Sequence, residues 1–308
     1  MSDILATLRT RFATDRVDVA WIGGSATWAL PVPECLGVPE GDIIHLSGTP
    51  TPWGPMGRYR LIDVDGRPLL RVPVHGWLSA EGRFEPGAEP SLRVFHVLRS
   101  LGVRLVIIDA SVGGIIPAPG DVLVTSDFVD NHDKPLAYAF AREEGLKASV
   151  RLAAPYCPRL RARLAAACRE ALSDDPAGYA PLSGRVHTEG VYVATPFGVF
   201  ETAAEIEEYR RAGWAVVGQS AGIETILARL CGMHVAHLCV SANWAEGLHG
   251  GAWHGDMAGF YRACTLPMAR ILWPVVRELA LQGLPEGECW CDTIGATSDM
   301  SGLPVAEA

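Results

Sequence analysis

The stretch 91–114, SLRVFHVLRSLGVRLVIIDASVGG, decides the fold class of this chain. Its first part, residues 91–101, carries apolar side chains at helical spacing, and residues 103–108 form a largely β-branched apolar run. Residues 110–114 are small and rich in glycine, which predicts a turn. A helix, a buried strand and a turn in succession are typical of a parallel or mixed sheet with helices packed on it.

The same alternation appears on both sides of this stretch. An apolar run at 17–22 ends in Gly23, Gly24 and Ser25, which suggests a buried strand followed by an anion-binding turn. Further strands are predicted at 191–194, 214–217 and 235–241, and helices at 151–164, 203–212, 223–231 and 256–282. The last of these helices contains Pro267 and Pro274, which we expect to kink it. The pattern predicts an α/β fold, with a central mixed sheet flanked by helices and one domain over residues 1–308.

Composition limits the classes of partner. With 49% hydrophobic and 20% charged residues, the chain of 308 residues can bury one large core. A net charge of −9 without a basic block argues against nucleic acid as a partner. The N-terminus lacks a secretory pattern, and no apolar run approaches the roughly 20 residues that span a bilayer. We therefore expect a cytoplasmic protein that does not bind membranes.

The eight cysteines are scattered along the chain, and only Cys289 and Cys291 lie close together. A zinc site would need a second close pair or nearby histidines, so we expect no metal. Two interpretations of this pair stay open, a redox-sensitive bridge or ordinary reduced thiols.

Three segments carry a resemblance to a known family. Residues 189–205, EGVYVATPFGVFETAAE, residues 213–228 and residues 241–247, SANWAEG, resemble the base, sugar and phosphate segments of trimeric purine nucleoside phosphorylases and methylthioadenosine phosphorylases. The Asn-Trp-Ala-x-Gly form is most similar to the methylthioinosine phosphorylase branch. The resemblance covers roughly residues 17–280. It implies the nucleoside phosphorylase fold, a pentosyltransferase of purine salvage with phosphate as co-substrate and no cofactor, and a homotrimer.

The departing base accumulates negative charge when the N-glycosidic bond breaks, so the site must stabilise an anionic purine. The carboxamide of Asn243 can accept from N7–H and donate to O6, and the carboxylate of Glu201 can accept from N1–H and from any 2-amino group. This pairing favours 6-oxopurines, because relatives that use adenine nucleosides resemble this pattern with aspartate in place of Asn243. The alternatives are a turn residue for Asn243 and a helix-terminal carboxylate for Glu201.

The resemblance assigns further substrate contacts. Phe200 would pack on the sugar or base. Gln219 stands where the family usually has methionine and would bond a pentose hydroxyl or indicate an altered pentose. His254 would lie near the 5′ group, with a surface or core histidine as the alternative.

The phosphate site is expected to contain Ser25, Ser111 and Ser220, with Ala110 and the family's phosphate-site histidine, His75. Small neighbours let backbone N–H groups approach an oxyanion at these serines. Each serine alone is also a common turn residue.

The phosphate site departs from the family pattern. Val74 stands before His75 where relatives have a nearby arginine, and Asp109 adds a carboxylate. Either Asp109 caps its loop or it activates water as a general base, and Arg71 or Arg58 can replace the missing cation. Three functions therefore stay open: a phosphorylase for inosine, guanosine or 5′-methylthioinosine, a hydrolase or other-acceptor enzyme, and a non-catalytic nucleoside-binding protein.

Overall fold

A computed structural model describes residues 1–74, 88–146, 150–175, 177–250 and 256–291. Its strands form one 11-stranded mixed sheet over the described residues. The strands are β1 (Val19–Gly23), β2 (Ile43–Leu46), β3 (Tyr59–Val64), β4 (Arg67–Val72), β5 (Leu105–Gly114), β6 (Val122–Val124), β7 (Asp127–Val129), β8 (Val186–His187), β9 (Val191–Ala194), β10 (Val216–Gly218) and β11 (His234–Trp244). The helices are α1 (Ser2–Phe12), α2 (Glu89–Ser100), α3 (Lys134–Glu143), α4 (Pro158–Asp174), α5 (Ala203–Arg211), α6 (Ala221–Leu230) and α7 (Met257–Gln282).

Strand β5 is the centre of the sheet. The order along the main path is β2-β3-β4-β1-β5-β10-β9-β7, and β11 pairs with β5 and β6 outside this path. Strands β1 and β11 run parallel to β5, whereas β10 is antiparallel to its last residues. The mixed sheet predicted from the sequence is therefore confirmed.

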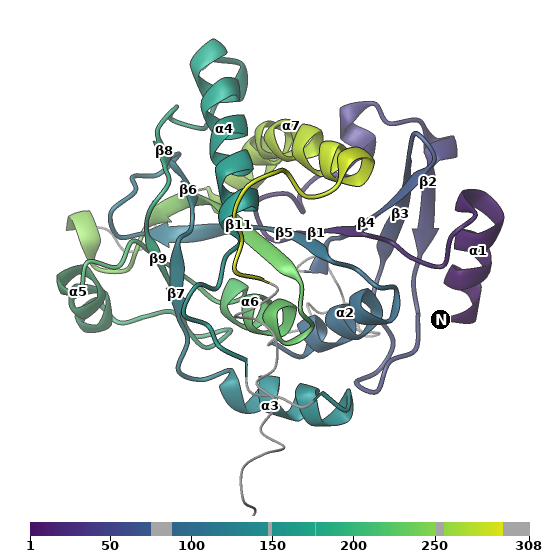
Figure 1. Cartoon of the computed structure of the whole chain (residues 1–308). Coiled ribbons are helices and arrows are strands. Elements are labelled where there is room, and N and C mark those ends of the chain that lie inside the picture. The colour runs from purple at the N-terminus through teal and green to yellow at the C-terminus, as the bar shows by residue number, and fades with distance from the viewer. Residues whose placement is uncertain (75–87, 147–149, 176, 251–255, 292–308) are drawn as a thin grey trace, which may run out of the picture.

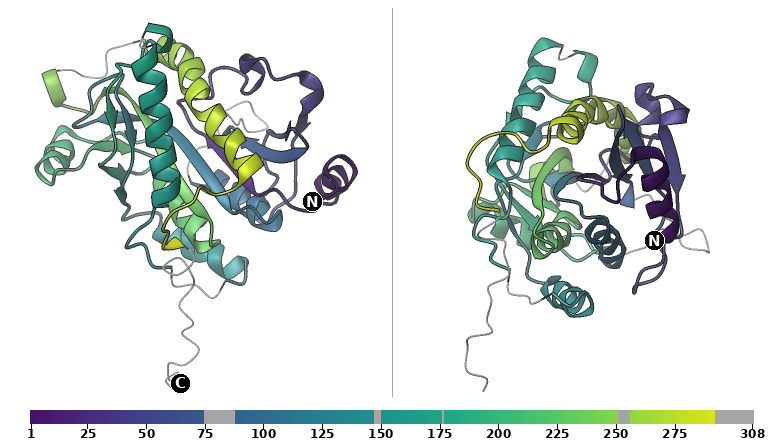
Figure 2. Two further views of the ribbon diagram at one scale, coloured as in Figure 1. Left: turned by 45° about the horizontal axis from the view of Figure 1, so that its top comes forward. Right: turned by 45° about the vertical axis from the view of Figure 1, so that its right-hand side comes forward.

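Helices cover both faces of the sheet (Figure 1). Helices α4 and α7 lie side by side over one face, as Figure 2 also shows. Helices α2 and α6 lie over the other face, and α3 packs against the outer side of α6. Alternate strand residues enter the two layers: Ala20 and Ile22 of β1 join one hydrophobic cluster, and Val19 and Trp21 join the other. Burial on both faces explains why the strands read as continuous apolar runs.

The expected turn at 110–114 is wrong, because these residues continue β5. Gly113 and Gly114 pair with Val217 and Val216 of β10 on one side and with β11 on the other. Pairing on both sides outweighs the weak strand preference of glycine. The glycines serve close packing instead, since a Cβ on Gly114 would lie 2.0 Å from the carbonyl oxygen of Pro117.

The helix expected at 151–164 begins later than predicted. Helix α4 starts at Pro158, and Arg151 lies before it. Proline is favoured in the first helical turn because its missing N–H has no helical partner there. Helix α7 continues through Pro267 and Pro274. No helix in the described ranges is both long enough and apolar enough to cross a bilayer.

Candidate active site

A cavity of about 340 Å³ opens where β1, β9, β10 and β11 end. Ligands of open α/β sheets commonly bind at the carboxyl ends of strands. Seven residues predicted for the site line this one cavity: Ser25, Ser111, Phe200, Glu201, Gln219, Ser220 and Asn243. They come from five segments of the chain, so the fold brings together what the sequence separates by more than 200 positions.

Asn243 and Glu201 both have orientations fixed by the protein. Asn243 lies near the end of β11, and its Nδ2 donates to the carbonyl of Trp244 at 2.8 Å. The second N–H of the amide remains available to a ligand. Glu201 lies before α5 and accepts from the hydroxyl of Thr195 at 2.5 Å. Its carboxylate has further lone pairs for donors in the cavity.

Gln219 holds the loop that borders the cavity. Its Oε1 accepts from the N–H of Gly198 at 3.2 Å, and its Nε2 donates to the carbonyl of Val199 at 3.1 Å. Phe200, on the same loop, lines the cavity and is 58% exposed. Gln219 therefore positions this loop, with one amide N–H left for a pentose hydroxyl.

The three serines lie in different local structures: Ser25 follows β1, Ser111 is inside β5, and Ser220 lies between β10 and α6. The hydroxyls of Ser25 and Ser111 are 2.5 Å apart, and the N–H of Ser111 donates to Ser25 Oγ at 3.1 Å. Ser220 is the N-cap residue of α6, and its N–H donates to the Tyr192 hydroxyl at 3.1 Å. The amino end of α6 adds a positive partial charge to this side of the cavity.

Ala110 is buried in β5 and does not line the cavity. Side chains alternate along a strand, so Ser111 faces the cavity and the methyl group of Ala110 faces the core. His75 and His254 lie outside the described residues.

The family model described as Phosphorylase superfamily matches residues 53–277. This chain belongs to the phosphorylase superfamily. The match covers β3 to α7 and hence most of the segments that form the cavity.

Individual relatives agree with this membership. The chain is 35% identical over 158 residues to a probable S-methyl-5′-thioinosine phosphorylase of Methanopyrus kandleri and 34% identical over 160 residues to a 6-oxopurine nucleoside phosphorylase of Pyrococcus furiosus. Both alignments cover 50% of this chain and 56% of the relative. A methylthioadenosine phosphorylase from an Antarctic soil metagenomic library has a similar structure, with a TM-score of 0.70, 20% identity and 92% coverage of each chain. That likeness confirms the predicted fold.

Asp109 does not face this cavity. It is 1% exposed, and its Oδ2 accepts from Trp21 Nε1 and Thr27 Oγ1, both at 2.7 Å. Its Oδ1 accepts from the N–H of Gly24 at 3.2 Å. Of its two possible roles, the structure supports the loop cap, since a general base must reach the proton it removes.

The expected substitute cations lie elsewhere. Arg71 is 1% exposed and donates to Thr27 and to the carbonyl of Val72. Arg58 is exposed and does not line the cavity. Val74 does line it, and no arginine or lysine does so among the described residues.

Sequence reasoning missed Phe197, on the same loop as Phe200, and two further aromatic residues of the cavity, Trp28 and Tyr261. The rings of Trp28 and Tyr261 meet edge to face with centroids 6.3 Å apart. Burial raises the pKa of Tyr261, so its hydroxyl stays protonated at neutral pH. Trp28 lies three residues after Ser25, so its closeness in sequence to a predicted phosphate-site residue could have indicated it. Nothing in the sequence marked Tyr261 on α7 as a cavity residue. Glu246, just after Asn243, also lines the cavity.

Proposed function

We propose that this phosphorylase cleaves the N-glycosidic bond of a 6-oxopurine nucleoside with phosphate as acceptor. The observation that carries the proposal is the presence of Asn243 and Glu201 in one cavity with the serines of the expected phosphate site. The names of two relatives, an S-methyl-5′-thioinosine phosphorylase and a 6-oxopurine nucleoside phosphorylase, support the same substrate class. Inosine, guanosine and 5′-methylthioinosine are the candidate substrates.

The base half of the site would stabilise the leaving group. Asn243 Oδ1 accepts from N7–H of the departing purine while the free N–H of its amide donates to O6, and Glu201 accepts from N1–H. The bond that O6 accepts from the Asn243 amide strengthens as negative charge develops on the purine, and protonation of N7, with its proton bound by Asn243 Oδ1, neutralises that charge; both favour the transition state over the ground state. An oxygen of HPO4²⁻ attacks C1′ as the C1′–N9 bond breaks, and the bonding pair leaves with the base. N7 takes up a proton from solvent, and the phosphate releases its own proton to solvent.

The phosphate half would rely on hydroxyls and on the amino end of α6. Ser25, Ser111 and Ser220 supply three hydroxyl groups at the cavity surface. The helix dipole and backbone N–H groups favour an anion there. Two carboxylates, Glu201 and Glu246, line the same cavity, so the acceptor is the part of the reaction that most needs a direct test.

The test compares base release from inosine with and without phosphate, over a phosphate titration in a phosphate-free buffer. We expect release to require phosphate, to saturate with it, and to give the pentose 1-phosphate in amounts equal to hypoxanthine. Equal rates without phosphate would identify a hydrolase instead. The burial of Asp109 removes the side chain that motivated that alternative. Tight nucleoside binding with no turnover would identify a binding protein.

A cytoplasmic homotrimer that acts in purine salvage completes the proposal. Its support is the family resemblance, together with apolar side chains on the loop that borders the cavity: Phe197, Val199 and Phe200 are 44%, 70% and 58% exposed. Exposed apolar residues of this kind mark contact surfaces. Light scattering tests the assembly, and a monomer at assay concentrations would contradict it.

A further inference from the structure

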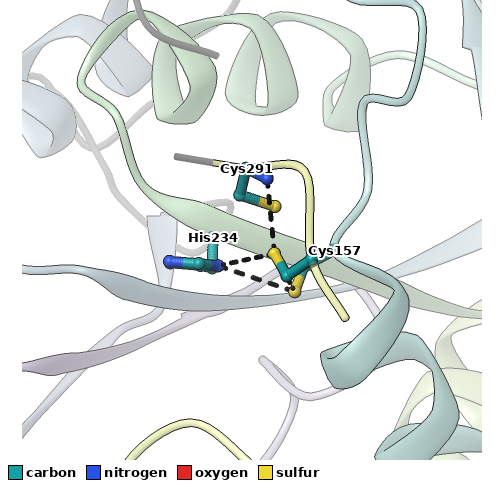
Figure 3. Close-up of side chains that lie close together, drawn as sticks. Cys157, His234 and Cys291 are labelled. Atoms are coloured by element: carbon teal, nitrogen blue, oxygen red, sulfur yellow. Dashed lines mark hydrogen bonds between the residues drawn. The ribbon is translucent and has the colours of Figure 1, made fainter. Parts of the chain in front are cut away.

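Three cysteines and a histidine from three distant segments converge at the amino end of β11. Figure 3 shows Cys157, His234 and Cys291 of this cluster. Cys157 lies directly before α4, His234 is the first residue of β11, and Cys289 and Cys291 lie on the segment after α7. One ligand atom from each of the four residues lies within 4.8 Å of every other. Three thiols and an imidazole are a common ligand set of structural zinc sites.

The spacing of the ligand atoms matches a tetrahedral metal site. Zinc bonds of about 2.3 Å to sulfur and about 2.05 Å to nitrogen place neighbouring sulfurs about 3.8 Å apart and a sulfur and a nitrogen about 3.6 Å apart. The Sγ atoms of Cys157 and Cys289 are 3.6 Å apart. The Nδ1 atom of His234 lies 3.6 Å from the first sulfur and 3.4 Å from the second.

The surroundings close the cluster and fix it. Cys157, His234 and Cys291 are 0%, 1% and 3% exposed, so solvent is largely excluded. The N–H of Cys157 donates to the carbonyl of Val235 at 2.8 Å, which ties α4 to β11. Arg229 is fully buried, and its Nη2 donates to the carbonyl of Cys291 at 2.9 Å.

A second arginine fixes the segment that leads from the end of α7 to the cluster. Arg159 of α4 donates to the carbonyls of Leu284 and Pro285 on the segment after α7. This segment leaves the end of α7 and crosses to the region where α4 and β11 begin (Figure 1). The chain after α7 is therefore directed to the cluster by contacts that do not involve its thiols.

We propose that Cys157, His234, Cys289 and Cys291 form a structural zinc site. Binding of Zn²⁺ releases the thiol protons to solvent and uses the lone pair on Nδ1 of neutral His234. No electrons are transferred. Three thiolates and one Zn²⁺ leave a net charge of −1, which the cation of Arg229 offsets beside the site. Four protein ligands leave no open position, which is the arrangement of structural rather than catalytic zinc.

The position of the site on β11 also separates it from the nucleoside cavity. His234 begins the strand and Asn243 is near its other end. At about 3.3 Å per residue, these two residues are roughly 30 Å apart. Zinc would therefore join the start of α4, the start of β11 and the segment after α7 without contacting the substrate.

The test is the metal content of the full-length protein, purified without chelators or metal-affinity resin. We expect about one zinc per chain, retained on dialysis against buffer and lost to a strong chelator under denaturing conditions. Replacement by Co²⁺ should give the visible bands and thiolate charge-transfer absorption of a tetrahedral thiolate site.

Two single substitutions separate the cluster from the other thiols. Cys289→Ser should lower the zinc content severalfold and lower the Tm of the zinc-loaded protein, while Cys35→Ser, at a partly buried cysteine outside the cluster, should change neither. Wild-type protein that stays metal-free in zinc-supplemented medium would overturn the proposal. A disulfide between two of the three cysteines in freshly purified protein would also overturn it. Both results are independent of phosphorolysis.

Discussion

The buried guanidinium of Arg71 and the buried carboxylate of Asp109 bind the same hydroxyl, that of Thr27. Arg71 Nη2 donates to Thr27 Oγ1 at 2.7 Å, and Thr27 Oγ1 donates to Asp109 Oδ2 at 2.7 Å. The two opposite charges thus offset each other beneath the loop that carries Ser25. The pKa of Arg71 is lowered to about 10, first by burial, and Asp109 opposes this shift. Arg71 stays protonated at neutral pH.

The first prediction concerns Asp109→Asn. The amide has only one oxygen, so it cannot accept all three hydrogen bonds that Asp109 receives from Trp21, Thr27 and Gly24. The substitution also removes the negative charge that offsets the buried cation of Arg71. We expect a loss of about 3 kcal/mol in the free energy of unfolding, measured by urea titration. Asp174→Asn, at an exposed aspartate, is the matched control and should change it by less than about 0.5 kcal/mol.

The same variant separates the two roles of Asp109. If Asp109 caps the loop, the folded fraction of the variant should keep kcat within about tenfold of wild type. A loss of kcat by a factor of about 1000 with unchanged unfolding free energy would instead make Asp109 a general base.

The second prediction concerns the choice of base at Asn243. In Asn243→Asp, a carboxylate replaces the donor to O6 and can accept from a 6-amino group. We expect kcat/KM for inosine to fall about 100-fold and the ratio of adenosine to inosine turnover to rise by at least as much. Asn131→Asp, at an exposed asparagine, should leave both values unchanged. Faster turnover of adenine than of 6-oxopurine nucleosides by the wild type would contradict the role of Asn243.

The third prediction concerns Glu201→Gln. The substitution places an amide that still accepts from N1–H but lacks the charge and adds a donor toward the base. We expect kcat/KM to fall about 100-fold for guanosine and about 10-fold for inosine. Guanosine loses more because its 2-amino group needs a second acceptor. Steady-state kinetics with both nucleosides measures this difference. Glu208→Gln, at an exposed glutamate of α5, should show none, and equal losses for the two substrates would remove the proposed contact to the 2-amino group.

Much of the fold could be predicted because local patterns and packing agree. Residues 191–194 are strand β9 as expected, and helix α5 begins at Ala203, where a capping box of Thr202 and Glu205 reinforces its start. The cavity residues could be predicted as a group, because the matched segments all end at the same edge of the sheet.

The rest depended on contacts between distant segments. The continuation of β5 through Gly113 and Gly114 is set by its neighbours β10 and β11, which glycine propensity does not reveal. The partners of Cys289 were equally hidden, since Cys157 lies 132 residues and His234 lies 55 residues before it. Sequence spacing finds a metal site only when its ligands come in close pairs.

The last prediction concerns His237, which lies in the middle of β11, fully buried against the rings of Tyr156 and Tyr192. Burial lowers its pKa to about 3, whereas an unfolded histidine titrates near pH 6.5. Between these values the unfolded state binds the additional proton, so stability rises with pH and is lost as the pH falls from 6.5 toward 3. From pH 7 to 4.5 this single group should cost about 3 kcal/mol.

Urea unfolding of wild type and His237→Gln at pH 7 and pH 4.5 measures this contribution. The variant loses packing at both pH values. Its unfolding free energy should nevertheless drop less than that of wild type between pH 7 and pH 4.5, by about 3 kcal/mol. His45→Gln, at an exposed histidine, should retain most of the wild-type drop. The same drop in His237→Gln and wild type would mean that His237 takes up its proton in the folded protein as readily as in the unfolded chain.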